Sequence, residues 1–177
     1  MNFDQLKIKI EHATKLAFTE LYQQHGHENI YAFALYSDEG AMTICPSTNS
    51  LAALKTVDPQ DFQYYQFEPA EWRYEMQGAD LAFNQISDEV RSTSLQYAED
   101  DQKFIEFRQK LYQSCIDVLV KLKQENFFTQ ITQQEIFLFF TVSDYEFEAE
   151  QVHNIVTQLN DNHYCADYLA WMKTWAD

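Results

Sequence analysis

The sequence predicts an α+β fold: a mainly antiparallel central sheet flanked by helices on both faces. Two continuous apolar runs, residues 30–36 and 136–142, lack the alternation of a half-exposed strand, so both faces of each strand should be buried. Several longer segments carry apolar residues at helical spacing. Only 3 glycines and 3 prolines punctuate the chain, which indicates long regular elements and argues against a hairpin-rich β-sandwich.

The whole chain, residues 1–177, is expected to form a single domain. Its 177 residues suit one hydrophobic core, and 46% of them are hydrophobic. The 14 Phe, 11 Tyr and 3 Trp argue against disorder, because disordered segments are poor in aromatic residues. We see no linker, internal repeat or low-complexity tract that would divide the chain.

The N-terminal half is expected to begin with an amphipathic helix over residues 3–24, which ends near Gly26. A buried strand over residues 30–36 follows, and residues 41–45 are its hairpin partner. Pro46 should end this second strand, because proline donates no ladder hydrogen bond.

The middle of the chain is the least regular part. Asn49 is a candidate cap for a short helix that runs to about residue 55. Two further strands are expected, one over residues 63–67 and one over residues 72–76. Residues 79–97 then show helical spacing, with Leu81 among the residues expected to be buried.

The C-terminal half is expected to be mostly helical around the second buried strand. A long helix should run from about residue 101 to residue 126, with acids at its start and lysines near its end, as the helix dipole favours. After the strand, Ser143 and Glu146 match a capping box for a helix that ends near Leu159. A last helix is expected over residues 163–175.

The charge is strongly negative and unevenly distributed. The chain has 28 acids and 12 bases, which gives a net charge of −16. Residues 16–54, 58–71 and 125–171 contain no Lys or Arg. Such a field repels nucleic acid and anionic membranes and attracts basic proteins. We therefore expect a basic protein partner, although acidity that serves only solubility explains the same composition.

The cysteines, the N-terminus and the lack of a long apolar stretch predict a cytoplasmic protein. Cys45, Cys115 and Cys165 are odd in number and widely spaced, so they match neither a disulfide framework nor a metal-spaced pair. The N-terminus has no basic segment followed by an apolar run, as a signal peptide would. No stretch of 18 apolar residues is present, so no membrane span is expected.

The missing motifs argue against several enzyme classes. Three glycines cannot form a P-loop or a dinucleotide fingerprint, and no Gly-x-Ser-x-Gly is present. His25 and His27 alternate as zinc ligands can, but nothing nearby completes a set of four. Cys45 lies where a nucleophile could, without a recognisable base. We therefore expect no cofactor, no metal and no catalysis, while a nonstandard carboxylate or Cys site stays the alternative.

The segment from residue 58 to residue 75 is the main candidate for partner contact, because acids and aromatic residues alternate there. Tyr and Trp are enriched at binding hot spots, and neighbouring acids would steer a basic partner. The expected contact residues are Asp58, Asp61, Tyr64, Tyr65, Glu68 and Glu71, with Glu146, Glu148 and Glu150 as a second face. One competing interpretation is that the aromatics fill the core, and Trp72 is expected to do so. The other is that Glu148 and Glu150 belong to a solvated helix face.

Several motifs, in this order, resemble an uncharacterised bacterial family known as a domain of unknown function. They are Tyr31-Ala-Phe-Ala-Leu-Tyr36, Pro46-Ser-Thr-Asn49, Pro69-Ala-Glu-Trp72-Arg-Tyr-Glu75, the helix over residues 104–122 and the strand that ends at Ser143-Asp144. The resemblance spans nearly the whole chain. It implies an immunity protein that binds a cognate bacterial toxin and occludes its active site. The alternatives are an enzyme and an adaptor or stress protein without a toxin partner.

Overall fold

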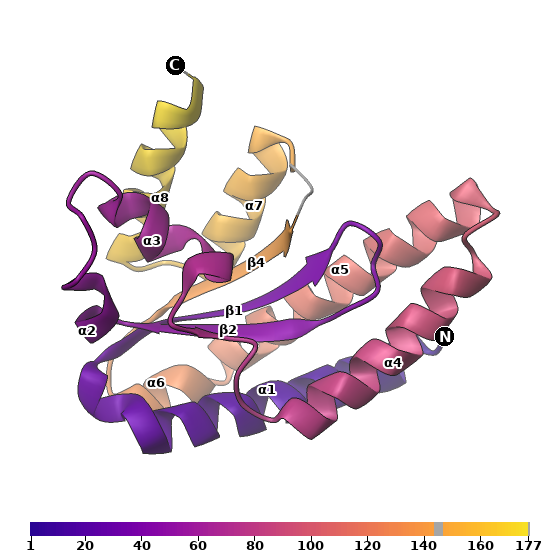
Figure 1. Cartoon of the computed structure of the whole chain (residues 1–177), viewed down its shortest axis with the longest axis horizontal. Coiled ribbons are helices and arrows are strands. Elements are labelled where there is room, and N and C mark those ends of the chain that lie inside the picture. Colours follow the sequence, from indigo (N-terminus) through magenta and orange to yellow (C-terminus); the bar gives the residue numbers. More distant parts are fainter. Residues whose placement is uncertain (144–146, 177) are drawn as a thin grey trace.

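The computed structural model describes residues 1–143 and 147–176, which form an α+β fold around a mixed sheet, mostly antiparallel (Figure 1). The strand order is β3-β2-β1-β4. The strands are β1 (Ile30–Asp38), β2 (Cys45–Ser50), β3 (Tyr74–Glu75) and β4 (Phe137–Ser143). β2 pairs antiparallel with β1 and with β3, whereas β4 runs parallel to β1.

Eight α-helices and three short 3-10 helices complete the described chain. The α-helices are α1 (Phe3–His25), α2 (Leu51–Leu54), α3 (Phe62–Phe67), α4 (Asp80–Gln96), α5 (Asp101–Gln124), α6 (Phe127–Thr132), α7 (Ala149–Leu159) and α8 (His163–Met172). The 3-10 helices are η1 (Gly26–Glu28), η2 (Pro69–Glu71) and η3 (Lys173–Ala176). In Figure 1, α1 and α4 lie below the sheet, and α7 and α8 lie above it.

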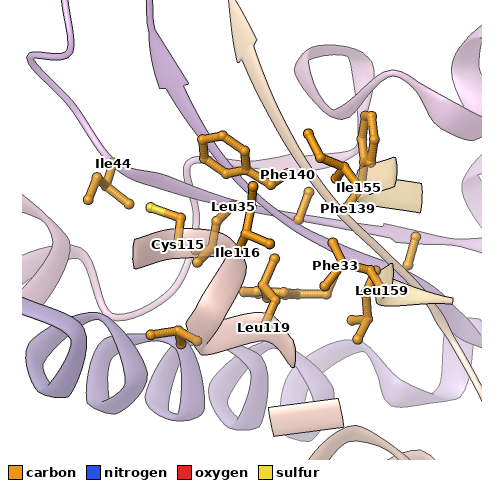
Figure 2. Packing of buried hydrophobic residues seen from close by; sticks show 14 of the residues in the cluster. Phe33, Leu35, Ile44, Cys115, Ile116, Leu119, Phe139, Phe140, Ile155 and Leu159 are labelled. Carbon is orange, nitrogen blue, oxygen red and sulfur yellow. The ribbon is translucent and has the colours of Figure 1, made fainter. Parts of the chain in front are cut away.

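The two central strands, β1 and β4, are buried along nearly their whole length, as the apolar runs predicted. Alternate side chains of β4 meet different helices. The Phe139 ring lies 5.1 Å from that of Tyr168 in α8, whereas Phe140 lies 5.5 Å from Tyr112 in α5. Figure 2 shows how Phe139 and Phe140 pack with residues of β1, α5 and α7 in one core. Burying each such ring stabilises the fold by about 1.5–3 kcal/mol.

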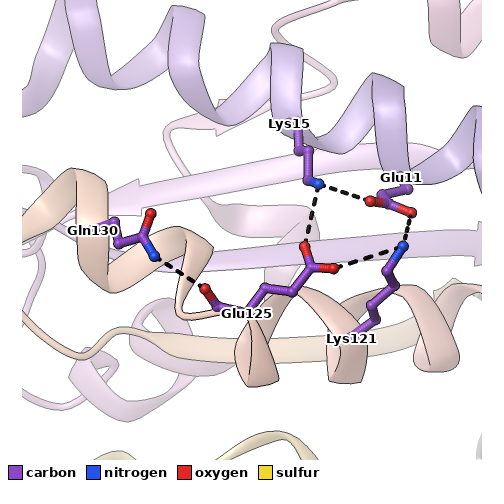
Figure 3. Close-up of polar contacts among 5 residues, drawn as sticks. All are labelled: Glu11, Lys15, Lys121, Glu125 and Gln130. Carbon is purple, nitrogen blue, oxygen red and sulfur yellow. Dashed lines mark hydrogen bonds and ion pairs between the residues drawn. The ribbon is translucent and has the colours of Figure 1, made fainter.

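Charged side chains join α1 to α5 on the outside of this core (Figure 3). Glu11 accepts hydrogen bonds from Lys15 and Lys121, each at 2.7 Å. Glu125 lies 3.3 Å from Lys15 and 3.7 Å from Lys121, which closes a ring of four charges. The lysine contacts lower the pKa of Glu11, first Lys121 and then Lys15.

A glycine before α4 and a buried asparagine beside β4 each meet a specific requirement of the backbone. Gly78, before α4, has a φ of +94°, and a Cβ there would lie 2.6 Å from Leu21 of α1 and 3.0 Å from the Ala17 backbone. Only glycine fits this close, left-handed approach. At the outer edge of β4, the buried Asn160 amide accepts from the Leu138 N–H and donates to the Leu138 carbonyl, both at 2.8 Å. The amide thus replaces a neighbouring strand at that residue.

The predicted strand over residues 41–45 was wrong, because β2 begins at Cys45. Pro46 lies inside β2, opposite Leu35, rather than at the end of the strand. Its missing N–H costs little because β3 pairs only with Ser47 and Thr48, and the Pro46 carbonyl still accepts from Met76 at 2.9 Å. The strand therefore tolerates proline beside its short partner.

The predicted strand over residues 63–67 was also wrong, because this segment is helix α3. Backbone bonds from Tyr65 to Asp61 (3.1 Å) and from Glu68 to Tyr64 (2.9 Å) close its turns. Aromatic residues favour strands, but in this segment the tertiary packing of Phe67 outweighs that preference. The next predicted strand, over residues 72–76, shrinks to the two residues of β3.

Two predicted helix caps were wrong as well. Ser50, not Asn49, caps α2, since its Oγ accepts from the Ala53 N–H at 3.2 Å. Helix α7 is capped by Glu148 with Gln151. Ser143 ends β4 instead, and Glu146 lies outside the described residues.

Other helix predictions were confirmed within a few residues: α1, α4, α5 and α8 follow the expected ranges. Helix α6 was not expected. Leu81, expected in the core, is 74% exposed on α4.

Candidate functional site

A groove of about 800 Å³ opens beside the C-terminal end of β4. Its walls come from α3 and η2, from β4, from the start of α7 and from α8 with η3. Its volume lies within the range of ligand pockets. The lining residues are Tyr64, Glu68, Ala70, Phe139, Thr141, Val142, Ser143, Phe147, Val152, Tyr168, Trp171 and Trp175.

Helix α3 is short but firmly held, so it can present side chains in fixed positions. Phe67, 1% exposed, packs its ring 5.1 Å from Phe137, 5.1 Å from Tyr168 and 5.7 Å from Trp171. The Tyr31 hydroxyl donates to the Gln66 carbonyl at 2.8 Å. These contacts fix the last turn of α3, from which Tyr64 and Glu68 reach the groove.

An aromatic wall faces α3 from α8 and η3. Tyr168, Trp171 and Trp175 follow one another at spacings of three and four residues, so they share one side of the helical turns. The ring of Trp171 lies 5.6 Å from that of Tyr168 and 5.0 Å from that of Trp175. Trp175 is 49% exposed and Trp171 is partly exposed, whereas Tyr168 is 3% exposed, so a partner can reach the two tryptophans of this wall.

Glu68 is the only acidic or basic side chain among the described residues that line the groove. Its carboxylate accepts one hydrogen bond, from the Ala70 N–H, and that bond is long at 3.4 Å. Burial, and then the nearby Glu71 charge, raise the pKa of Glu68. Burial together with the Glu68 charge also raises the pKa of Tyr168. The groove therefore combines apolar walls with one poorly compensated negative charge.

The first predicted set of contact residues divides around this groove. Tyr64 and Glu68 line it. Glu71 is exposed near them and lies 3.4 Å from the Tyr64 hydroxyl, while Tyr65 packs its ring 5.6 Å from Tyr64. Asp58 and Asp61 are exposed in the turn before α3, where the Asp58 carboxylate accepts from the Gln60 N–H at 2.9 Å.

The described members of the second predicted set lie at the start of α7. Glu148 and Glu150 are exposed at the start of α7, and Glu146 lies outside the described residues. Phe147, which immediately precedes Glu148, and Val152 both line the groove. Glu148 is therefore adjacent in sequence to a residue that lines the same groove as Tyr64 and Glu68.

Comparisons with known proteins place the chain in a family. A family model matches residues 10–161, most of the chain. The chain belongs to this family, described as a domain of unknown function (DUF4303). The DUF4303 match includes α3, β4 and α7 and ends before α8, which carries the aromatic wall. Neither the curated proteins nor the solved structures contain a match.

Both interpretations of the aromatics in the segment from residue 58 to residue 75 apply in part to this DUF4303 chain. Phe67, Trp72 and Tyr74 are buried, so Trp72 belongs to the core as expected. Phe62 and Tyr64 are 40% and 44% exposed. Exposed aromatic residues beside acids are the part of the segment that can contact a partner.

The aromatic wall of α8 was missed as part of the site. The sequence places Tyr168, Trp171 and Trp175 on one side of a helix, which is also the pattern of a core-facing helix. Phe139 was assigned to a strand buried on both faces. Only the fold shows that these residues face Glu68 across a groove.

The sequence candidates for catalysis and metal binding lie elsewhere. Cys45 is buried, and burial raises its pKa, which disfavours the thiolate that a nucleophile requires. His25 stacks 4.3 Å from Tyr74 and lies 3.2 Å from Glu28. Among residues 1–143 and 147–176, we find no group of three or more His, Cys, Asp or Glu that could hold a metal ion. Over the same ranges, every helix is too short or too polar to cross a bilayer.

Proposed function

We propose that this DUF4303 chain is a cytoplasmic immunity protein that binds a cognate bacterial toxin through the groove and its acidic rims, and thereby occludes the active site of the toxin. The observation that carries the proposal is the aromatic groove, which holds one poorly compensated carboxylate on a chain of net charge −16. In this proposal the sheet is a middle layer with helices on both of its faces, and the groove opens on one face of the sheet.

Two physical arguments support binding to a basic protein. Trp and Tyr supply large contact areas and are enriched at hot spots of protein interfaces. Acids at both rims, including Glu71 and Glu148, would speed the encounter with a positively charged partner and orient it. Exposed carboxylates at the rim and apolar walls in the centre match the usual division of an interface into a polar rim and an apolar core.

An enzyme is the second candidate, and one observation favours it. Glu68 has a raised pKa inside a groove, as general acids and bases often do. In that function Glu68 would exchange a proton with a substrate, and Tyr64, which also lines the groove, would be a candidate partner group. An adaptor or stress protein without a toxin partner would use the same groove for another protein.

The first experiment is co-expression with the product of the neighbouring gene, followed by a binding measurement on the purified pair. We expect tight binding and restored growth of cells that produce the toxin. Absence of both would overturn the immunity proposal and direct attention to the enzyme.

Variants locate the binding surface. Reversing two rim charges in the pair Asp61→Lys and Glu71→Lys should weaken binding at least about tenfold, because like charges across an interface repel. The matched control reverses two exposed acids far along the chain, Glu99→Lys and Glu106→Lys, with the same change in net charge. Equal losses in the two pairs would show that net charge alone, and not this rim, determines binding.

A further inference from the structure

The carboxylates of this chain that are shielded from solvent differ in how they are compensated. Glu28 accepts hydrogen bonds from Tyr74 (2.7 Å) and Ser50 (3.1 Å), and His25 and Arg73 lie nearby. Glu11 accepts from two lysines (Figure 3). These donors lower the pKa of each carboxyl group, with the Tyr74 bond the first cause for Glu28 and the Lys121 bond for Glu11. The fold therefore supplies several donors to both of these carboxylates.

Glu68 has no such compensation. Within the described chain, no Lys, Arg or His forms an ion pair with it, and its single donor is the Ala70 N–H at 3.4 Å. The described lining residues include no positive charge. A half-buried carboxylate with a single long hydrogen bond and no ion pair is destabilising unless a group from outside supplies further donors.

The walls around Glu68 suit a flat cation. Tyr64, Trp171 and Trp175 present partly or largely exposed aromatic rings, whose faces attract cations electrostatically. A guanidinium is planar, stacks on aromatic faces, and matches a carboxylate with two parallel donors, whereas an ammonium is a strongly hydrated point charge. The volume of about 800 Å³ accommodates an arginine side chain together with part of its backbone.

We propose that the groove receives one arginine side chain of the partner protein, whose guanidinium pairs with the Glu68 carboxylate and lies against the rings of Trp171 and Trp175. The arginine site deepens the proposed function, and it rests on that function in one respect: the arginine belongs to a partner protein. The acids at the rims guide the basic partner to the groove, and Glu68 then holds the arginine in place.

The test titrates the purified chain with N-acetyl-L-arginine amide and follows the indole N–H signals of its three tryptophans by NMR. Trp171 and Trp175 line the groove and should shift, whereas Trp72 is buried elsewhere and serves as an internal control. A probe of this size should bind with a dissociation constant on the order of 1 mM. The neutral isostere N-acetyl-L-citrulline amide should cause no comparable shifts.

Two variants assign the binding to Glu68. Glu68→Gln should weaken the arginine probe about tenfold, because it removes the charge and keeps the shape. Glu99→Gln makes the same change at an exposed position between α4 and α5 and should change the affinity less than about twofold. Unaltered circular dichroism of both variants establishes that they are folded.

The proposal would be overturned if the signals of Trp171 and Trp175 did not shift at about 20 mM arginine probe, well above the expected dissociation constant. It would also be overturned if the citrulline probe bound equally well, or if the Glu68→Gln variant bound the arginine probe as tightly as the wild-type chain. Equally tight binding of tetramethylammonium would overturn it too, because the groove would then be a site for small organic cations. The purified chain is tested without any toxin. Arginine binding without rescue by co-expression would therefore refute the immunity function alone, and rescue without arginine binding would refute the arginine site alone.

Discussion

Replacing Glu68 by Gln should stabilise the unbound chain, although it weakens binding. In the folded state the carboxylate is half-buried, accepts only the 3.4 Å bond from Ala70 and lies near the Glu71 charge. Gln keeps an acceptor for the Ala70 N–H and removes the charge. Removing this incompletely solvated charge should raise the free energy of unfolding by about 1 kcal/mol. This is the low end for buried charged groups, because Glu68 retains some solvent contact.

The assay is urea unfolding of the wild-type chain and of Glu68→Gln across pH. Burial raises the pKa of Glu68 above its ordinary value of 4.5, so the folded state releases this proton less readily than the unfolded state. The wild-type chain therefore loses stability relative to the variant as pH rises through the raised pKa. The difference should be fully present above the raised pKa and vanish below about pH 4. For a chain of this size, 1 kcal/mol corresponds to about 2–4 °C in Tm.

The result that refutes this reasoning is a variant less stable than the wild-type chain at pH 7, or a difference that does not change with pH. Either would mean that Glu68 has favourable partners in the folded state. The case for an occupant that supplies donors from outside would then lose its main support. A stabilised variant that binds less tightly would instead show the exchange of stability for binding that functional sites often display.

Three further predictions concern the scaffold and are read out by urea unfolding. Gly78→Ala should lower the free energy of unfolding by about 2 kcal/mol or more, because φ is +94° and the new Cβ would lie 2.6 Å from Leu21. Gly40→Ala is the control and should lower it much less, because its new Cβ meets flexible side chains. Asn160→Leu should cost about 2–4 kcal/mol, because both backbone groups of Leu138 lose a buried partner, and Asn154→Leu on the exposed face of α7 should cost under about 0.5 kcal/mol. Glu11→Gln should cost about 1 kcal/mol at pH 7. Because lysine contacts lower the pKa of Glu11, this cost should shrink as pH falls below about 4.5.

The parts of the fold that could be predicted from sequence are those in which local pattern and burial agree. The apolar runs became β1 and β4, and the long amphipathic segments became α1, α4, α5 and α8. The parts that failed depend on contacts between distant residues. Residues 62–67 are rich in aromatics, yet they form α3 because Phe67 packs on Phe137 and Trp171, which are far along the chain.

The candidate site was partly accessible from sequence for the same reason. Tyr64 and Glu68 were selected from the alternation of acids and aromatics, and both line the groove. The sequence could not indicate that Trp171 would face them, because an aromatic stripe on a helix is equally expected in a core. It also could not distinguish Glu68 from Glu71. Only the structure shows that one is shielded from solvent and the other exposed.

The groove and its rims should contribute to different steps of association. Rim acids such as Asp61 and Glu71 are exposed, so they act through the long-range field, which salt screens within about 8–10 Å. Glu68 is shielded and acts only after contact. With the toxin as partner, rim reversal should therefore lower the association rate and its salt dependence, whereas Glu68→Gln should mainly raise the dissociation rate. Stopped-flow mixing at several ionic strengths measures both rates. If Glu68→Gln instead lowered the association rate and left dissociation unchanged, Glu68 would be one more steering charge, and the groove would not be the seat of the bound side chain.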